Sequence, residues 1–235
     1  MFPLGFGFDP TFILLLPAFG FAMWAQWKVR STFEKYSRVR AANGLTGRDM
    51  ARQIMQRNGV SDVQVEPVQG MLSDHYDPRS RTVRLSASNY SGDSISSIAV
   101  AAHEVGHVLQ HHEGYVPLQL RSSMTPVVGI TSNAAMPLFL IGLLIGPRVP
   151  FASTLMDLGI IFFAGTVLFH LVTLPVEFDA SKRALAQLTS TGAVMPQEVE
   201  GAKQVLNAAA LTYVAAASVA VLNLVRLLVL RNNRR

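Results

Sequence analysis

The sequence contains no cysteine, which excludes disulfide bonds, thiolate metal sites and cysteine nucleophiles. It is also poor in charge, since 15% of its 235 residues are charged and 50% are hydrophobic. The net charge of +5 does not indicate a nucleic-acid partner, because the basic residues lie beside apolar stretches and are not interleaved with aromatic residues. This composition fits either one large soluble domain or a small membrane protein.

The distribution of the apolar residues favours the membrane protein. A helix needs about 20 apolar residues to cross a hydrocarbon core of about 30 Å. Four stretches are candidates, at residues 12–27, 125–145, 155–176 and 208–230. The first ends in tryptophan residues, where a cleavable signal peptide would carry small ones, and no basic segment precedes it. We therefore expect it to be a retained anchor.

This pattern predicts a mainly α-helical integral membrane protein with about four transmembrane helices and one soluble α+β lobe that carries a small antiparallel sheet. The expected divisions are an N-terminal anchor (1–27), the soluble lobe (28–124), a transmembrane hairpin (125–176), a helix with a connector (177–204) and a C-terminal transmembrane helix (205–235).

Local signals outline the soluble lobe. A helix is expected to begin after Thr46 and to stop at Asn58, which precedes a glycine. Three β-like runs follow, at 63–68, 71–76 and 82–85. The edge of such a sheet can bind an extended peptide by strand addition, or it can serve only as a lid.

One segment of the lobe has the spacing of a metal site. The sequence His103-Glu104-Val105-Gly106-His107 lies in a run that predicts a helix from about 94 to 112. Residues four apart on a helix lie about 6 Å apart on one face, so the two imidazoles can hold one metal ion. Two imidazoles and a carboxylate suit Zn²⁺, and a water at an open fourth position has its pKa lowered to about 7. Glu104 is then placed to act as the general base. The alternative is a pair of packed, hydrogen-bonded histidines.

The third ligand must come from another part of the chain. A metzincin would carry glycine and histidine seven and ten residues after His103, where this sequence has Gln110 and Glu113. The next two apolar stretches cross the membrane twice and return the chain to the side of the metal helix, which favours Glu177 as the third ligand. Asp179 can then orient a ligand histidine. Alternatively, both acids cap the first turn of a helix.

Three segments carry a resemblance to a known family. They are Ala101-Ala102-His103-Glu104-Val105-Gly106-His107, Leu72-Ser73-Asp74-His75-Tyr76-Asp77-Pro78 and Leu174-Pro175-Val176-Glu177-Phe178. The chain resembles, nearly end to end, the YugP-type membrane zinc metallopeptidases of bacteria, and more distantly the HtpX and CAAX-processing gluzincins. The resemblance implies a gluzincin-like lobe, one Zn²⁺, and endopeptidase activity on peptides or proteins, membrane proteins among them, at the bacterial cell membrane.

The match also assigns residues. In the gluzincin pattern a glutamate ligand follows H-E-x-x-H, with an aspartate four residues after that glutamate. The match puts Glu177 on the ligand and Ser181 on the aspartate. The role of that aspartate beside a ligand is then unfilled or taken by Asp179.

Three other polar residues are weighed as site residues. His75 and Tyr76 are candidates to stabilise the oxyanion, as such donors do in zinc peptidases. A strand places only alternate residues on one face, so at most one of the two is expected at the site. His111, one turn after His107, is expected at the surface, because ligands must converge from different elements.

The charges that flank the first apolar stretch predict its orientation. Five basic residues and one acidic residue follow it closely, namely Lys28, Arg30, Lys35, Arg38 and Arg40 with Glu34. The positive-inside rule then places the N-terminus outside and the lobe, with its site, on the cytoplasmic side. The basic tail of Arg231, Arg234 and Arg235 would lie outside, against the same rule, so the inverse orientation stays open.

Two other functions stay open. An intramembrane protease would use Asp157 as its third ligand, but the apolar run before His103 is interrupted by Asp93 and is too short to cross. A membrane scaffold would have a structural zinc closed by a fourth protein ligand, His111 or Asp179. The alanine-rich last stretch, with its regularly placed small polar residues, suits packing against another helix of this chain, of a second copy or of a membrane partner.

Overall fold

The computed structural model describes residues 10–70, 73–146, 148–190 and 194–233. The chain forms two compact units. The first, called here the apolar unit, contains Met1–Trp24, Ser122–Leu171 and Val214–Arg235. The second, called the α/β unit, contains Ala25–Arg121 and Val172–Tyr213.

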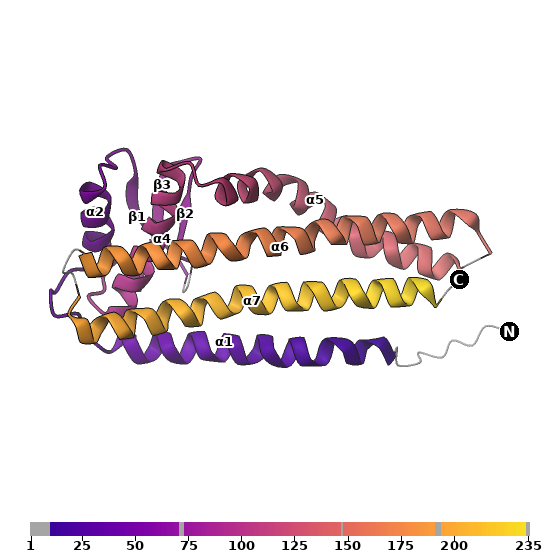
Figure 1. Cartoon of the computed structure of the whole chain (residues 1–235), viewed down its shortest axis with the longest axis horizontal. Helices are drawn as coiled ribbons and strands as arrows, with labels where there is room; N and C mark the ends of the chain where they lie inside the picture. The colour runs from indigo at the N-terminus through magenta and orange to yellow at the C-terminus, as the bar shows by residue number, and fades with distance from the viewer. Residues whose placement is uncertain (1–9, 71–72, 147, 191–193, 234–235) are drawn as a thin grey trace. The chain divides into compact units, whose positions relative to one another are not determined.

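The long helices of the chain are the membrane-spanning candidates (Figure 1). Each is long and apolar enough to cross a membrane, yet only 17% to 22% of its apolar window is buried inside the protein. Such apolar, unburied surface is what lipid would cover. The four stretches predicted from the sequence fall inside these helices, which are η1 (Pro10–Leu15) with α1 (Leu16–Ser37), α5 (Val116–Ile145), α6 (Pro150–Ser190) and α7 (Pro196–Asn232).

Proline does not end the helices in which it occurs. Pro126 and Pro137 lie inside α5, and Pro175 lies inside α6. The separate helix expected from residue 177 is therefore wrong, because α6 runs on through Glu177 to Ser190. Transmembrane helices tolerate proline where neighbouring groups satisfy the freed backbone atoms. The apolar span and the segment carrying Glu177 are thus one continuous element.

A small core and one ion pair join the helices of the apolar unit. Phe139, Met156 and Leu227, one each from α5, α6 and α7, are buried together. Asp157 on α6 pairs with Arg231 on α7, with 2.7 Å between Oδ2 and Nη2. One charge of the basic tail is therefore partnered within the chain.

The α/β unit contains the predicted lobe as far as Arg121, together with Val172–Tyr213 (Figure 1). The Thr46 side chain caps the first lobe helix, accepting a hydrogen bond from the Asp49 backbone at 3.2 Å, and Ser94 caps the metal helix in the same way. Both helices are therefore confirmed. The elements that lie wholly within the unit are α2 (Gly47–Arg57), β1 (Gln64–Val68), β2 (His75–Asp77), β3 (Thr82–Ser86), α3 (Ala87–Ser91) and α4 (Ile95–His112).

The sheet is mixed, not wholly antiparallel. Its strand order is β1-β3-β2, where β2 pairs antiparallel to β3 and β1 pairs parallel to β3. The prediction is therefore wrong for β1, because the connection at 69–81 is long enough for a crossover, which parallel pairing requires. The strand expected at 71–76 corresponds to β2, which begins at His75. Residues 71–72 lie outside the described residues.

The core of the α/β unit surrounds the metal helix. Fully buried side chains come from α2 (Met50, Ile54), β3 (Val83, Leu85), α4 (Ile98, Val105) and α6 (Leu188). Most of α4 is consequently buried, including the polar residues Glu104, His107 and Gln110. Buried polar groups need partners, and those of α4 define the site.

Candidate metal centre

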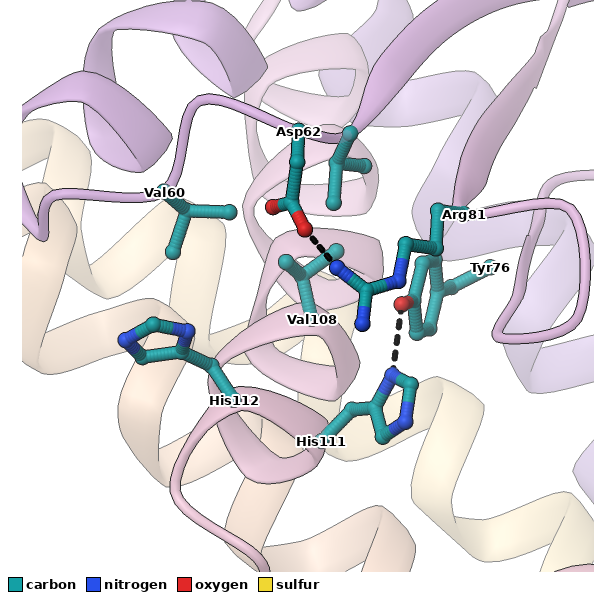
Figure 2. Close-up of a pocket in the computed structure, with 8 residues that line it drawn as sticks. Val60, Asp62, Tyr76, Arg81, Val108, His111 and His112 are labelled. Carbon is teal, nitrogen blue, oxygen red and sulfur yellow. Dashed lines mark hydrogen bonds and ion pairs between the residues drawn. The ribbon is translucent and has the colours of Figure 1, made fainter.

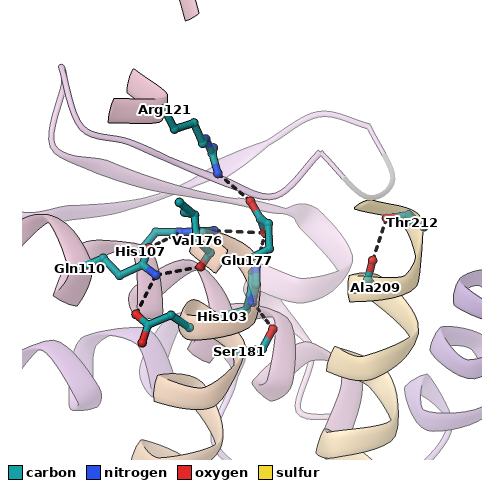
Figure 3. Close-up of polar contacts among 10 residues, drawn as sticks. His103, His107, Gln110, Arg121, Val176, Glu177, Ser181, Ala209 and Thr212 are labelled. Atoms are coloured by element: carbon teal, nitrogen blue, oxygen red, sulfur yellow. Dashed lines mark hydrogen bonds and ion pairs between the residues drawn. The ribbon is translucent and has the colours of Figure 1, made fainter. Parts of the chain in front are cut away.

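Two elements of the α/β unit bring three candidate ligands together. His103 and His107 lie on α4, and Glu177 lies on α6. Oε2 of Glu177 is 3.2 Å from Nε2 of His103 and 3.6 Å from Nε2 of His107. Figure 3 shows the two imidazoles and this carboxylate facing one another. One ligand atom from each residue lies within 4.8 Å of the others, which is the spacing of groups that can share one metal ion.

The other oxygen of Glu177 is held by an arginine that the sequence did not single out. Arg121 Nη1 lies 2.6 Å from Glu177 Oε1 (Figure 3). The Glu177 side chain is only 3% exposed, and a buried carboxylate is costly unless it is paired. The ion pair therefore compensates the burial of Glu177 and leaves Oε2 for the imidazoles. From the sequence, Arg121 counted only as one of the basic residues that flank the apolar stretches.

The remaining nitrogen of each imidazole also has a partner. His103 Nδ1 lies 3.1 Å from Ser181 Oγ, and His107 Nδ1 lies 3.0 Å from Gln110 Oε1. Ser181 thus contacts a candidate ligand from the sequence position that the family's aspartate would take. The carboxylate of Asp179 accepts a hydrogen bond from Gln110 Nε2 at 2.9 Å, so it reaches His107 through that amide.

Glu104 is buried beside the candidate ligands. Burial raises the pKa of Glu104 to about 7, and the negative charges of Glu177 and Asp74 act in the same direction. The neighbouring His103 and a hydrogen bond from the backbone of Tyr76 favour the ionised carboxylate and hold the pKa down. That backbone belongs to β2, which is an edge strand of the sheet. The edge strand therefore runs beside Glu104, as the strand-addition hypothesis requires.

The side chains expected to stabilise an oxyanion have other partners. The Tyr76 hydroxyl lies 2.8 Å from His111 Nδ1, in a pocket of about 140 Å³ (Figure 2). Burial raises the pKa of this hydroxyl to about 12. His75 Nδ1 lies 2.8 Å from the carbonyl oxygen of Ser73, and its side chain is exposed. The oxyanion role of His75 and Tyr76 stays a prediction that these contacts do not support.

The alternative ligands are placed elsewhere. His111 lines the pocket with Tyr76, and Asp157 belongs to the apolar unit, where it pairs with Arg231. The group of described residues that can share an ion is His103, His107 and Glu177, without His111, Asp157 or Asp179.

A glycine inside the H-E-x-x-H segment allows the two ligand-bearing helices to approach. A Cβ atom added at Gly106 would lie 2.5 Å from the carbonyl oxygen of Ala180 on α6. No side chain fits at that distance without moving backbone. Gly106 therefore permits the α4–α6 contact that brings Glu177 to the histidines.

We expect Gly106→Ala to push α4 and α6 apart. Overpacking of this kind costs about 1–3 kcal/mol, so the variant should unfold at lower temperature and bind less zinc per chain. Thermal unfolding and metal analysis of detergent-purified protein measure both effects. Gly129→Ala is the control, because a Cβ there would meet no atom within 4 Å. Wild-type unfolding and full zinc binding in Gly106→Ala would contradict the packing role.

The helices and the site together define a class of protein. Four membrane-crossing candidates, together with two histidines on an H-E-x-x-H helix that meet a glutamate from a second helix, are what a membrane zinc metallopeptidase would present. Comparison with known proteins gives the family: the chain belongs to the one described as "Putative neutral zinc metallopeptidase", which matches residues 11–232.

A named relative covers nearly the whole chain. "Putative membrane protease YugP" of Bacillus subtilis (strain 168) is 51% identical over 222 residues, which are 94% of this chain and 96% of that protein. No solved structure matches the chain. The resemblance and the fold class are thereby confirmed, and the chain is a multi-pass membrane protein of a zinc metallopeptidase family.

Proposed function

We propose that this protein is a membrane-anchored zinc endopeptidase in which His103, His107 and Glu177 hold one Zn²⁺. The observation that carries the proposal is the convergence within 4.8 Å of two imidazole nitrogens from the H-E-x-x-H helix and one carboxylate oxygen from α6. The family supports zinc as the metal and peptides as the substrate class.

The donor set fits Zn²⁺. Two imidazole nitrogens and one carboxylate oxygen are the protein ligands of a catalytic zinc site that keeps a position open. The partners of the ligands fit as well, since each Nδ1 and the second oxygen of Glu177 already have their own contacts. When bound, the ion would make a water more acidic and polarise the carbonyl of the scissile bond.

Glu104 is the proton carrier in this proposal. Its carboxylate adjoins His103 in sequence, and its burial puts the pKa near neutrality, where one group can both take and return a proton. Glu104 takes the proton of the attacking water and passes it to the nitrogen of the leaving amine. The backbone of β2 holds the substrate as an added strand, which keeps its carbonyl beside Glu104.

We also propose that the α/β unit faces the cytoplasm. The basic residues after the first apolar stretch support this orientation by the positive-inside rule. In this orientation the basic C-terminal tail lies outside, against the same rule. The pairing of Arg231 with Asp157 reduces this conflict, because it neutralises one of the positive charges. Cysteines introduced singly at Arg30 and Arg57 would test the orientation, since labelling of intact cells by an impermeant thiol reagent would contradict it.

The detergent-purified full chain should cleave an unfolded soluble protein such as casein. Removal of metal with a chelator should abolish cleavage, and stoichiometric Zn²⁺ should restore it, because the ion supplies the polarisation that the side chains cannot. Gel electrophoresis and metal analysis of the same samples measure both.

The assay also separates the alternatives. Cleavage confined to membrane-embedded segments would support an intramembrane protease instead. Bound zinc with no hydrolysis of any peptide would support a scaffold with a structural zinc. Hydrolysis that survives complete metal removal would contradict the zinc mechanism itself.

A further inference from the structure

Gln110 is a fully buried amide that joins the metal helix to α6. Its Oε1 lies 3.0 Å from His107 Nδ1, and its Nε2 donates to Val176 O at 2.8 Å and to Asp179 Oδ2 at 2.9 Å. Its relative exposure is 0%. Figure 3 shows Gln110 beside His107 and Val176. A buried amide with this many partners has one orientation available to it.

The chemistry of the partners decides that orientation. A backbone carbonyl and an ionised carboxylate can only accept hydrogen bonds, so the NH₂ group of Gln110 must face Val176 and Asp179. Its oxygen must then face His107, and an amide oxygen can only accept. A neutral His107 must therefore carry its proton on Nδ1, which leaves the lone pair of Nε2 available to a metal ion shared with Glu177.

Asp179, the acceptor at the other end of the Gln110 amide, is itself held by an ion pair. Asp179 Oδ2 lies 2.5 Å from Arg183 Nε, and Arg183 Nη1 lies 2.6 Å from Glu113 Oε2. The guanidinium of Arg183 donates to the carboxylate of Asp179 and holds it in place as an acceptor for Gln110. Glu113, Arg183, Asp179 and Gln110 thus form one hydrogen-bonded chain that ends on His107.

We propose that Gln110 is a positioning residue that fixes the tautomer of His107 and so prepares its Nε2 to bind the metal. This inference rests on the proposed function. The two candidate histidines differ in this respect, because the hydroxyl of Ser181 beside His103 can either donate or accept. Gln110 therefore fixes the tautomer of His107, whereas the contact with Ser181 does not by itself fix the tautomer of His103.

The test compares Gln110→Met with Gln110→Glu. Methionine removes the acceptor, whereas glutamate keeps it. Nitrogen-15 NMR of histidine-labelled, metal-free full chain in detergent, recorded at a pH at which the imidazole is neutral, reports the tautomer directly, with His107→Asn to assign the signal. We expect an Nδ1–H tautomer for His107 in the wild type and in Gln110→Glu, and a mixture of tautomers in Gln110→Met. The zinc dissociation constant of Gln110→Met should rise about 10- to 100-fold, as for other partners of metal ligands.

Two controls separate tautomer control from general packing. Gln119→Glu makes the same change from glutamine to glutamate at an exposed residue of α5. It should alter neither the His107 tautomer nor the zinc dissociation constant. Ser181→Ala should leave the His107 tautomer unchanged, because it acts on His103.

Two results would overturn the inference. One is an Nε2–H tautomer for His107 in the wild type, and the other is a Gln110→Met variant with wild-type tautomer and zinc affinity. The wild-type tautomer is read without any change at Gln110. Neither readout depends on proteolysis, so an inactive protein with the expected tautomer would count against the proposed function alone.

Discussion

Glu104→Gln should lower the rate of peptide hydrolysis by about 10²- to 10⁴-fold, the usual contribution of a general base, while zinc stays bound. Glutamine keeps the size of the side chain but cannot take a proton from water. The three candidate ligands are unchanged, so metal content should equal that of the wild type. Initial rates on a fluorogenic peptide, measured with metal analysis of the same sample, test both parts.

The control for this variant is Glu66→Gln, which makes the same change at an exposed residue of β1. It should have wild-type activity. Hydrolysis by Glu104→Gln at the wild-type rate would remove Glu104 from the mechanism. Loss of zinc from that variant would instead show that Glu104 supports the site and is not only its base.

Glu177→Ala should lose the metal. Two imidazoles alone leave the ion with a single protein element, whereas the carboxylate closes the site from α6. The zinc dissociation constant should rise by more than the roughly 10- to 100-fold typical of partners outside the ligand set. Activity at limiting zinc should fall with it, and competition with a chromophoric chelator measures the affinity.

Glu177→Gln separates the charge of the ligand from its volume, because it fills the same space beside Arg121. It too should bind zinc weakly, since a neutral amide replaces an anionic ligand. Stoichiometric zinc in purified Glu177→Ala would contradict the assignment of Glu177. Circular dichroism must show that the helices are retained, because removal of the acid leaves Arg121 without this partner.

The sequence predicted the elements that local chemistry determines. Thr46 and Ser94 mark the starts of α2 and α4 because their side chains satisfy free backbone donors at the first turn. The histidine spacing on α4 follows from helix geometry alone. Glu177 could be proposed because two crossings of a membrane return a chain to the same side, and the structure brings it to the histidines.

Other features depend on contacts that no local pattern records. The parallel pairing of β1 with β3 depends on a crossover connection, which the residues within the two strands do not specify. Arg121 and Gln110 became informative only once their partners on α6 were known. The only sign of this role in the sequence was the place of Gln110 in an apolar helical run, because a buried glutamine needs a hydrogen-bond partner.

The central claim is that one ion is shared by three side chains from two helices. Crystallography of the zinc-loaded full chain, with anomalous data collected at the zinc edge, tests it most directly. The account predicts one anomalous peak between Nε2 of His103, Nε2 of His107 and the carboxylate of Glu177, with a coordination position left to solvent. A peak elsewhere, or a fourth protein side chain in that position, would contradict it.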